Sequence, residues 1–254
     1  MTKKKYYTIS SLEKGIKILE LLAMHKELSV SEVAKMMNTN RAGSHRFIST
    51  LKDLGYVEQN ENNKYQSTLK IMNLATKVVN RFEIRQIARP YMHKLSTMYK
   101  ETVNLGFFKN SEIIHLDKID CLEILRMDSA LGDIAPAYCT GLGKAILAFL
   151  PEHELAHYLE NMEFKQLTPN TITSKDKFLL ELSSIRKKKY AIDNEEMAIG
   201  LCCIAAPIFD HNSYPAYAIS VSGPSLRITH HVLEEIKINI LQVSSELSQM
   251  MGTL

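Results

Sequence analysis

The chain has 254 residues, 45% of them hydrophobic and 23% charged, which is ordinary for a globular protein and argues against a fibrous or disordered one. No apolar run approaches the ~18 residues that a membrane-spanning helix needs, so no membrane partner is expected. The net charge is only +3, but residues 1–85 hold 15 Lys and Arg against 8 Asp and Glu, whereas residues 86–254 hold 16 against 20. The basic first third indicates a negatively charged partner, although a solvated basic surface would give the same counts.

The cysteine pattern favours a reduced protein. The four cysteines show no CxxC spacing, and no apolar signal-peptide segment follows the opening MTKKKYY. We therefore expect a cytoplasmic protein with no cofactor, no bound metal and no disulfide. The cysteines are Cys121, Cys139, Cys202 and Cys203.

Two short helices are predicted at the start of the chain. Each opens with the spacing of a capping box, Ser10 with Glu13 in the first helix and Ser29 with Glu32 in the second. Apolar residues recur at helical spacing in the first helix, which predicts its buried side. That side is expected to contain Leu12, Ile16, Leu19 and Ala23.

A third helix is predicted through RAGSHRFISTLKDL, ending at Gly55. Two short extended pieces, YVEQN and KYQST, follow it and are joined by a polar turn. Three short helices followed by a hairpin predict a winged helix-turn-helix, whose last helix reads DNA. A small helical protein-binding module with a solvated basic face remains the alternative.

The third helix is expected to present polar residues to DNA. Phe47, Ile48, Leu51 and Leu54 are expected to face inward, and steps of 100° then place Arg41, His45, Ser49 and Lys52 on the opposite side. Arg41 and His45 lie where base edges are met, and Arg46 lies on the flank, where a phosphate contact is expected. The predicted DNA-binding residues are Arg41, Ser44, His45, Arg46, Ser49 and Lys52.

The middle of the chain is helical in period from Leu69 to about Tyr99, with a break expected near Pro90. Such a helix would link two domains and space the copies of a dimer. The predicted organisation is a DNA-binding domain over 1–70, a linker helix over 71–89 and a second domain over 90–254.

The second domain is predicted to be α+β. TVNLGFFKN with EIIHLDKI predicts one β-hairpin, and LCCIAAPIF with YPAYAISVS predicts another. Helices are expected over 143–161, 175–188 and 229–250. A sheet with helices on it is the pattern of a small-molecule sensor.

The second hairpin indicates a ligand-facing surface. If Phe209 pairs with Tyr214, Cys203 lies opposite Ser220, and Ser222 shares their face because side chains alternate along a strand. These side chains are small and weakly polar, which leaves room for a ligand. Close packing of a helix over small residues would explain the same pattern. Asp193, in a turn-like segment, is a further polar candidate.

The stretch YCTGLGKAILAFL resembles the end of a phosphate-binding loop but lacks two of the residues that such a loop needs. A P-loop needs G-x-x-x-x-G-K-[ST], and Tyr138 and Ala145 stand where the first Gly and the Ser or Thr belong. Nucleotide binding is therefore rejected. Thr140 and Gly141 instead precede an apolar helix expected from Lys144 to Leu150, and free N–H groups at a helix start can hold a carboxylate.

Residues 153–157 spell H-E-x-x-H, a zinc-hydrolase motif. Three fixed positions in five are a weak pattern, and the expected buried stripe of this helix runs through Leu155, Leu159 and Met162 rather than through both histidines. We expect His153 and His157 to be partly exposed and to hold no zinc.

Taken together, the chain resembles the isocitrate-lyase-regulator (IclR) family of bacterial transcriptional regulators. The resemblance runs nearly end to end and is carried by the order and spacing of several stretches. They are SLEKGIKILELL, RFISTLKDLGYV, YCTGLGKAILAFLPEHEL, LTPNTIT, AIDNEEMAIGLCCIAAPIFD and AISVSGPSLRI.

The resemblance implies a winged helix-turn-helix joined by a helix to a GAF-like effector domain, in dimers or tetramers. It also implies control of a catabolic operon by a small organic acid, such as 2-keto-3-deoxygluconate, glyoxylate or pyruvate. The matching effector-binding positions are Thr140, Gly141, Asp193, Cys203, Ser220 and Ser222.

The sequence departs from the family pattern at the third helix. Ala42 and Gly43 stand where a Ser-Thr pair is common, and Thr39 stands where an apolar residue is common. Gly43 costs roughly 1 kcal/mol of helix stability relative to Ala. Gly141 stands where Ala is frequent, which is expected to widen the pocket mouth.

The expected function is therefore that of a ligand-responsive repressor that binds a near-palindromic operator and is not an enzyme. Two alternatives are a zinc hydrolase and a sensor that acts through protein partners.

Overall fold

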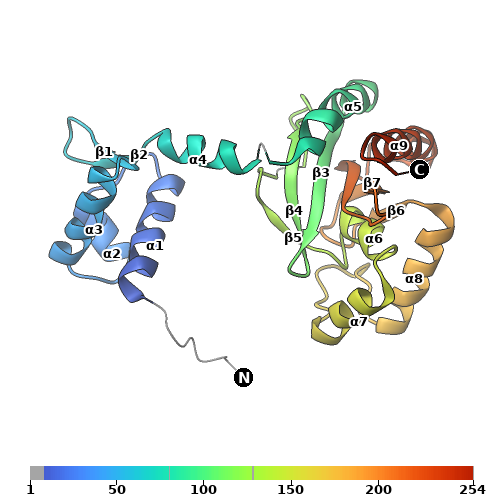
Figure 1. Cartoon of the computed structure of the whole chain (residues 1–254), viewed down its shortest axis with the longest axis horizontal. Helices are drawn as coiled ribbons and strands as arrows, with labels where there is room; N and C mark the ends of the chain where they lie inside the picture. Colours follow the sequence, from blue (N-terminus) through green and yellow to red (C-terminus); the bar gives the residue numbers. More distant parts are fainter. Residues whose placement is uncertain (1–8, 80, 128, 254) are drawn as a thin grey trace. The chain divides into compact units, whose positions relative to one another are not determined.

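The computed structural model describes residues 9–79, 81–127 and 129–253. The chain divides into two compact units, Met1–Arg81 and Phe82–Leu254 (Figure 1). Each unit has its own hydrophobic core.

The first unit begins with a bundle of short helices and continues into a two-stranded antiparallel sheet and a further helix. Its elements are α1 (Ser10–Met24), α2 (Val30–Met36), α3 (Arg41–Asp53), β1 (Val57–Gln59), β2 (Tyr65–Ser67) and α4 (Lys70–Val79). Its core includes Ile18 from α1, Val33 from α2 and Ile48 from α3, all at most 1% exposed. The predicted winged helix-turn-helix is confirmed.

The start of α1 differs from the prediction. Ile9 rather than Ser10 occupies the N-cap and makes no side-chain cap bond, while Glu13 pairs with Lys17 at 2.8 Å. The capping box of α2 is present as predicted, since Ser29 accepts from the Glu32 N–H and Glu32 accepts from the Ser29 N–H.

The buried side of α1 is also displaced from the predicted one. Ile18 and Leu22 are buried, whereas Leu12 and Ile16 are 62% and 47% exposed and Ala23 is exposed too. Both sets of apolar residues repeat at helical spacing, so periodicity alone could not tell which set enters the core.

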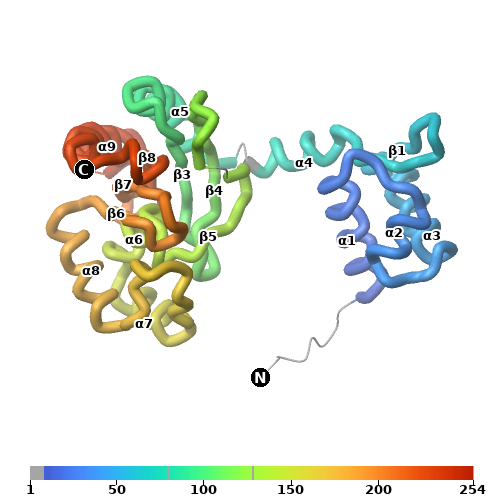
Figure 2. The backbone as a smooth tube through the Cα atoms, turned by 180° about the vertical axis from the view of Figure 1, so that it is seen from behind, coloured from blue at the N-terminus to red at the C-terminus, as the bar shows by residue number. Residues whose placement is uncertain are grey.

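The second unit is built on a six-stranded sheet in the order β5-β4-β3-β8-β7-β6, in which all neighbouring strands are antiparallel. Strands β3 and β8 are far apart in the sequence and lie side by side (Figure 2). The strands are β3 (Thr102–Lys109), β4 (Glu112–Ile119), β5 (Ile134–Pro136), β6 (Ala191–Asn194), β7 (Leu201–Ile208) and β8 (Tyr217–Pro224).

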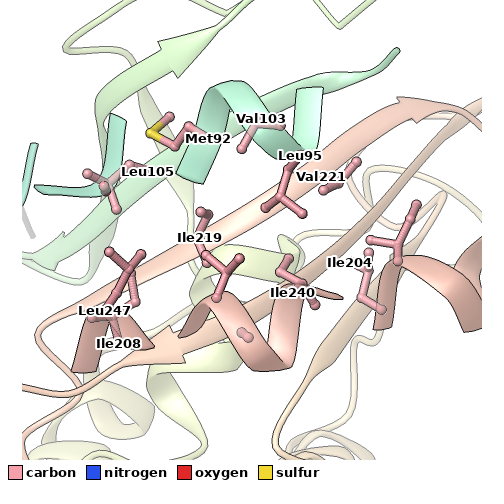
Figure 3. Packing of buried hydrophobic residues seen from close by; sticks show 14 of the residues in the cluster. Met92, Leu95, Val103, Leu105, Ile204, Ile208, Ile219, Val221, Ile240 and Leu247 are labelled. Atoms are coloured by element: carbon pink, nitrogen blue, oxygen red, sulfur yellow. The ribbon is translucent and has the colours of Figure 1, made fainter. Parts of the chain in front are cut away.

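Helices cover both faces of this sheet. Helices α5 (Glu83–Tyr99) and α9 (His230–Met250) pack on one face, where Leu95, Ile219 and Ile240 meet in a closed core (Figure 3). The second core, on the other face, includes residues of α6 (Gly141–Leu147), α7 (Glu152–Asn161) and α8 (Lys175–Lys188). The α+β class is confirmed.

Two helices occupy the middle of the chain, and Arg81 and Phe82, just before α5, lie outside both of them, whereas the break was expected near Pro90. Pro90 lies inside α5, on its exposed side, where the carbonyl that a proline leaves unpaired can face water. Ile84, Ala88 and Met92 of α5 are 0% exposed in the core of the second unit. The sequence placed the start of the second domain at residue 90, whereas α5 packs into the second unit from residue 83 onward.

The register of the second hairpin differs from the prediction by two residues. Cys203 pairs with Ser222 and Ala205 with Ser220, whereas Cys203 was expected opposite Ser220. The connection is longer than predicted because Asp210 caps a turn and Pro215 has no N–H for the ladder. A shift of two preserves which face each side chain occupies, so the predicted face is correct.

No helix among the described residues is long and apolar enough to cross a membrane.

Candidate functional site

Helix α3 of the first unit carries the predicted DNA-binding residues, and its start is shaped by Asn40. The Asn40 side-chain oxygen accepts the N–H of Gly43 at 2.7 Å. A Cβ at Gly43 would lie 3.0 Å from the same oxygen, tighter than ordinary contact. The departure at Gly43 therefore has a local reason, because the missing side chain leaves room for the cap.

The exposed side of α3 presents cationic side chains. Arg41, Arg46 and Lys52 are exposed, as is His45, and Ser49 is half-buried. None of these residues takes part in an ion pair among the described residues. Unpaired cations on one helix face are suited to phosphate and base-edge contacts.

Ser44 was predicted to face DNA, but the structure buries it. Its side chain is 0% exposed, and its hydroxyl lies 2.7 Å from the hydroxyl of Thr39, so it joins the turn to α3 inside the domain. Leu54, expected inside, is 53% exposed. The burial of Ser44 agrees with helical spacing, because Ser44 lies three and four residues before Phe47 and Ile48 and therefore on their side of α3. Leu54 is the C-cap of α3, where the regular helical spacing ends.

All six predicted effector residues line one cavity in the second unit. The cavity lies between the face of the sheet that bears Cys203, Ser220 and Ser222 and the start of α6, and its volume is about 50 Å³. The predicted members are Thr140, Gly141, Asp193, Cys203, Ser220 and Ser222. Strand alternation had placed Cys203, Ser220 and Ser222 on one face, and the structure adds Asp193 of β6 and the start of α6 to the same cavity.

The serines of this wall form a connected polar surface. The hydroxyls of Ser220 and Ser222 lie 3.4 Å apart, and the amide of Asn104 donates to Ser222 at 3.4 Å. Both serines are at most 1% exposed, so a ligand would meet them shielded from water. Hydroxyls both donate and accept, which suits hydroxyl or keto oxygens of a ligand.

Asp193 is a buried carboxylate at one end of this surface. It is 2% exposed, and its Oδ1 accepts the N–H groups of Glu196 at 2.7 Å and Met197 at 3.3 Å. Burial raises the pKa of Asp193 to about 6, while those N–H bonds favour the ionised form. Burial likewise raises the pKa of the Cys203 thiol to about 12, so Cys203 is not a nucleophile at neutral pH.

The start of α6 differs from the predicted anion site. The helix runs Gly141–Leu147, so the glycines lie in its first turn, and Thr140 caps it by accepting the Gly143 N–H at 3.2 Å. A Cβ at Gly141 would lie 2.9 Å from Cys203 Sγ, and one at Gly143 would overlap the backbone of Ala137. The glycines therefore allow close packing of α6 against β7 and against the backbone of Ala137.

Lys144, which completes the P-loop-like sequence, is a buried structural cation. It is 1% exposed, pairs with Glu196 and donates to the carbonyl of Ile192 at 2.6 Å. These bonds hold α6 against β6 and the turn that follows it, beside Asp193. Lys144 does not line the cavity.

Sequence reasoning missed the wall of the cavity formed by β3, β4 and the segment after β4. Asn104 and His115 come from the strands, and Met127 comes from the connection that follows. A polar residue at an inward position of an apolar strand was the available signal for Asn104 and His115. Met127 carried no such signal, because nothing in its sequence neighbourhood places it beside the sheet.

The H-E-x-x-H segment lies on α7, away from the cavity lining. His153 and His157 are both exposed, and His157 is hydrogen-bonded to Asn161 of the same helix. The described residues contain no cluster of three or more His, Cys, Asp and Glu placed to hold a metal ion.

The sequence matches two family models. "IclR helix-turn-helix domain" matches residues 11–61, and "Bacterial transcriptional regulator IclR C-terminal" matches residues 76–249. The HTH-type transcriptional regulator KdgR of Escherichia coli is 35% identical over 246 residues, covering 96% of this chain and 94% of that protein.

Solved structures show the same fold. The crystal structure of Thermotoga maritima IclR superimposes with a TM-score of 0.89 at 35% identity, covering 96% of this chain and 100% of that one. An IclR homologue from Microbacterium hydrocarbonoxydans, solved in complex with 4-hydroxybenzoate, shares the fold at 16% identity with a TM-score of 0.80, covering 95% and 98% of the two chains.

The matched models are adjacent, follow the order of the two units and together span most of the sequence. The chain therefore belongs to the IclR family of bacterial transcriptional regulators, which are DNA-binding proteins and not enzymes.

Proposed function

We propose that this protein is a cytoplasmic repressor that binds a near-palindromic operator as a dimer or tetramer and releases it in response to a small organic acid. The observation that carries the proposal is the single cavity lined by all six residues expected to bind an effector. The unpaired cationic face of α3 supports the DNA-binding half of the proposal.

The chemistry of the cavity favours a keto acid or sugar acid. The serine hydroxyls suit a keto or hydroxyl oxygen, and Asp193 suits a ligand hydroxyl that donates to it. A volume of about 50 Å³ holds only a few water-sized groups. A six-carbon acid such as 2-keto-3-deoxygluconate therefore requires side chains to move, and the flexible Met127 and Met197 of the lining are suited to do so.

Effector control requires that the acid bind one arrangement of the chain better than another. An acid that opens the cavity meets this condition, because the arrangement with the cavity contracted cannot accommodate it. The two exposed histidines of α7 give no support to the zinc-hydrolase alternative. The exposed cationic side chains of α3 favour DNA as the partner over another protein.

The DNA-binding half is tested on α3. Two recognition helices of a dimer are expected to meet successive major grooves, and phosphate contacts make binding weaken steeply with salt. Arg41→Ala and His45→Ala are expected to relax base preference, whereas Arg46→Ala weakens binding to every sequence. Unchanged affinity and preference in Arg41→Ala and His45→Ala would show that this face does not read DNA.

The effector half is tested by a thermal-shift screen of keto acids and sugar acids, followed by calorimetric titration. Loss of one hydroxyl, in Ser220→Ala or Ser222→Ala, should weaken binding of the selected acid by about 0.5–1.5 kcal/mol. Ser245→Ala, on α9, is the control and should bind as wild type does. Equal affinity in the two cavity variants and wild type would place the effector elsewhere.

A further inference from the structure

The cavity has a polar end that none of the six expected effector residues occupies. His115 lies there on β4, and it is 5% exposed. Its ring nitrogen Nδ1 is buried and has no hydrogen-bond partner among the described residues. A buried polar atom without a partner destabilises the protein. Because His115 lines the cavity, a polar group of a bound ligand could supply the missing hydrogen bond.

His115 and Asp193 lie at opposite ends of a polar row across the sheet. Strands β4, β3, β8, β7 and β6 are consecutive neighbours; His115 lies on the first and Asp193 on the last. Asn104 on β3 and the serines of β8 lie between them and are hydrogen-bonded to one another. A ligand that follows this row meets one titratable side chain at each end.

Apart from His115, the described cavity lining offers no positive charge for the carboxylate of an acid. Of the described residues that line it, none is Lys or Arg, and Asp193 is acidic. A buried carboxylate without a positive partner is strongly disfavoured. Lys144 is nearby in the sequence of α6, but it is committed to Glu196 and to the Ile192 carbonyl.

His115 is the one described lining side chain that becomes a cation by taking up a proton. Burial lowers its pKa, to which Lys118 also contributes, while Asp133 opposes the shift, so the ring is neutral in the free protein at neutral pH. Lys118 pairs with Asp120, and the α5 arginines, Arg85 and Arg89, pair with Asp117. None of these cations lines the cavity.

We propose that His115 is the partner of the effector's carboxylate and takes a proton from solvent as the acid binds, while Asp193 accepts a hydroxyl at the other end. The proposal rests on the proposed function and narrows the effector to a hydroxylated monocarboxylate. The neutral ring keeps the empty cavity free of buried positive charge, and the charge-assisted hydrogen bond forms only with the acid present.

The proposal is tested by calorimetric titration of the full chain with 2-keto-3-deoxygluconate and with pyruvate, which lacks the hydroxyls. Titrations at pH 6.5 and 7.5, in two buffers of different ionisation enthalpy, measure proton uptake. Binding of the hydroxylated acid should take up close to one proton, so its affinity falls about tenfold between these pH values. Pyruvate should bind more weakly and show the same pH dependence.

Variants assign the proton to a residue. His115→Asn retains a hydrogen-bonding amide but cannot become a cation, so proton uptake and pH dependence should disappear and affinity at pH 6.5 should fall at least tenfold. His157→Asn, at an exposed histidine of α7, should behave as wild type. Asp193→Asn should weaken the hydroxylated acid but leave proton uptake in place.

The outcomes separate this inference from the proposed function. Acid binding without proton uptake, or uptake lost in Asp193→Asn and kept in His115→Asn, overturns the role of His115 and leaves the regulator intact. Failure of both acids to bind wild type at either pH, with DNA binding preserved, overturns the acid effector and the role of His115 together. Wild-type binding without proton uptake overturns the role of His115 even if a variant does not fold.

Discussion

Asp193 shows at the residue scale how a binding site lowers stability. Its carboxylate is buried beside Glu196, and two backbone N–H bonds only partly offset the loss of water. Its pKa is raised to about 6 from an ordinary value of 3.8. The folded state therefore binds the proton more tightly than the unfolded state, and folding stability declines as pH rises through this range.

Asp193→Asn should therefore stabilise the protein, most strongly above pH 6. The amide oxygen still accepts the N–H bonds, while the buried charge, which costs up to about 3 kcal/mol, is removed. The free energy of unfolding, measured in urea at pH 5.0 and 8.0, should show a larger gain at pH 8.0. A gain that is equal at both values would mean that Asp193 titrates normally.

The cap of α3 offers a second residue-scale test. Asn40→Ala should cost about 1 kcal/mol, and Gly43→Ala alone should change little, because the gain of roughly 1 kcal/mol in helix propensity is opposed by the close contact with Asn40. In the Asn40→Ala background, Gly43→Ala should recover its full gain. Additive effects in this double-mutant cycle would show that the two residues are independent.

At the scale of elements, the sequence predicts well whether a long segment is a helix or a strand. It predicts poorly where short strands lie and which helix belongs to which domain. Helix α8 has the predicted bounds, 175–188, because its apolar period and flanking residues agree. Strands β5 and β6 were missed as strands because three or four residues carry too little pattern. The break before α5 was missed because Pro90 is the stronger helix-breaking signal, although its exposed position makes it tolerable.

Helix α4 has more exposed apolar surface than an isolated helix tolerates. Met72, Leu74 and Val78 are 66%, 52% and 47% exposed, and a helix of 10 residues is marginal alone in water. A second copy of the chain covering this helix would bury that surface, which agrees with the proposed oligomer.

Leu74→Glu should therefore weaken self-association, because it places a charge in the buried contact. The measurement is molar mass by light scattering over a range of concentrations, and the dissociation midpoint should move at least tenfold higher. Asn73→Glu, on the polar side of α4, is the matched control and should leave the mass unchanged. If Leu74→Glu retained the wild-type assembly, α4 would not be the contact.

At the scale of the whole molecule, the sequence predicts the order of the parts and six residues that line one cavity. The predicted register of β7 and β8 was wrong by two residues, but the predicted faces were right. A shift of two keeps every side chain on its face of the sheet. His115 and Asn104 were not identified because their place in the cavity depends on the pairing of β3 with β8, between segments more than a hundred residues apart. A polar residue at an inward position of an apolar strand marks each of them as unusual, but which residues it meets follows only from the fold.

The regulator itself is tested most directly by selecting duplexes from a random library and measuring their affinity by fluorescence anisotropy with and without the acid found by thermal shift. The selected sites should be near-palindromic, with half-sites spaced by whole turns of DNA. Saturating acid should weaken binding to the selected duplex at least fivefold, the lower range of typical allosteric coupling. Absence of any selected sequence, or equal affinity with and without an acid that demonstrably binds, would contradict a ligand-controlled repressor.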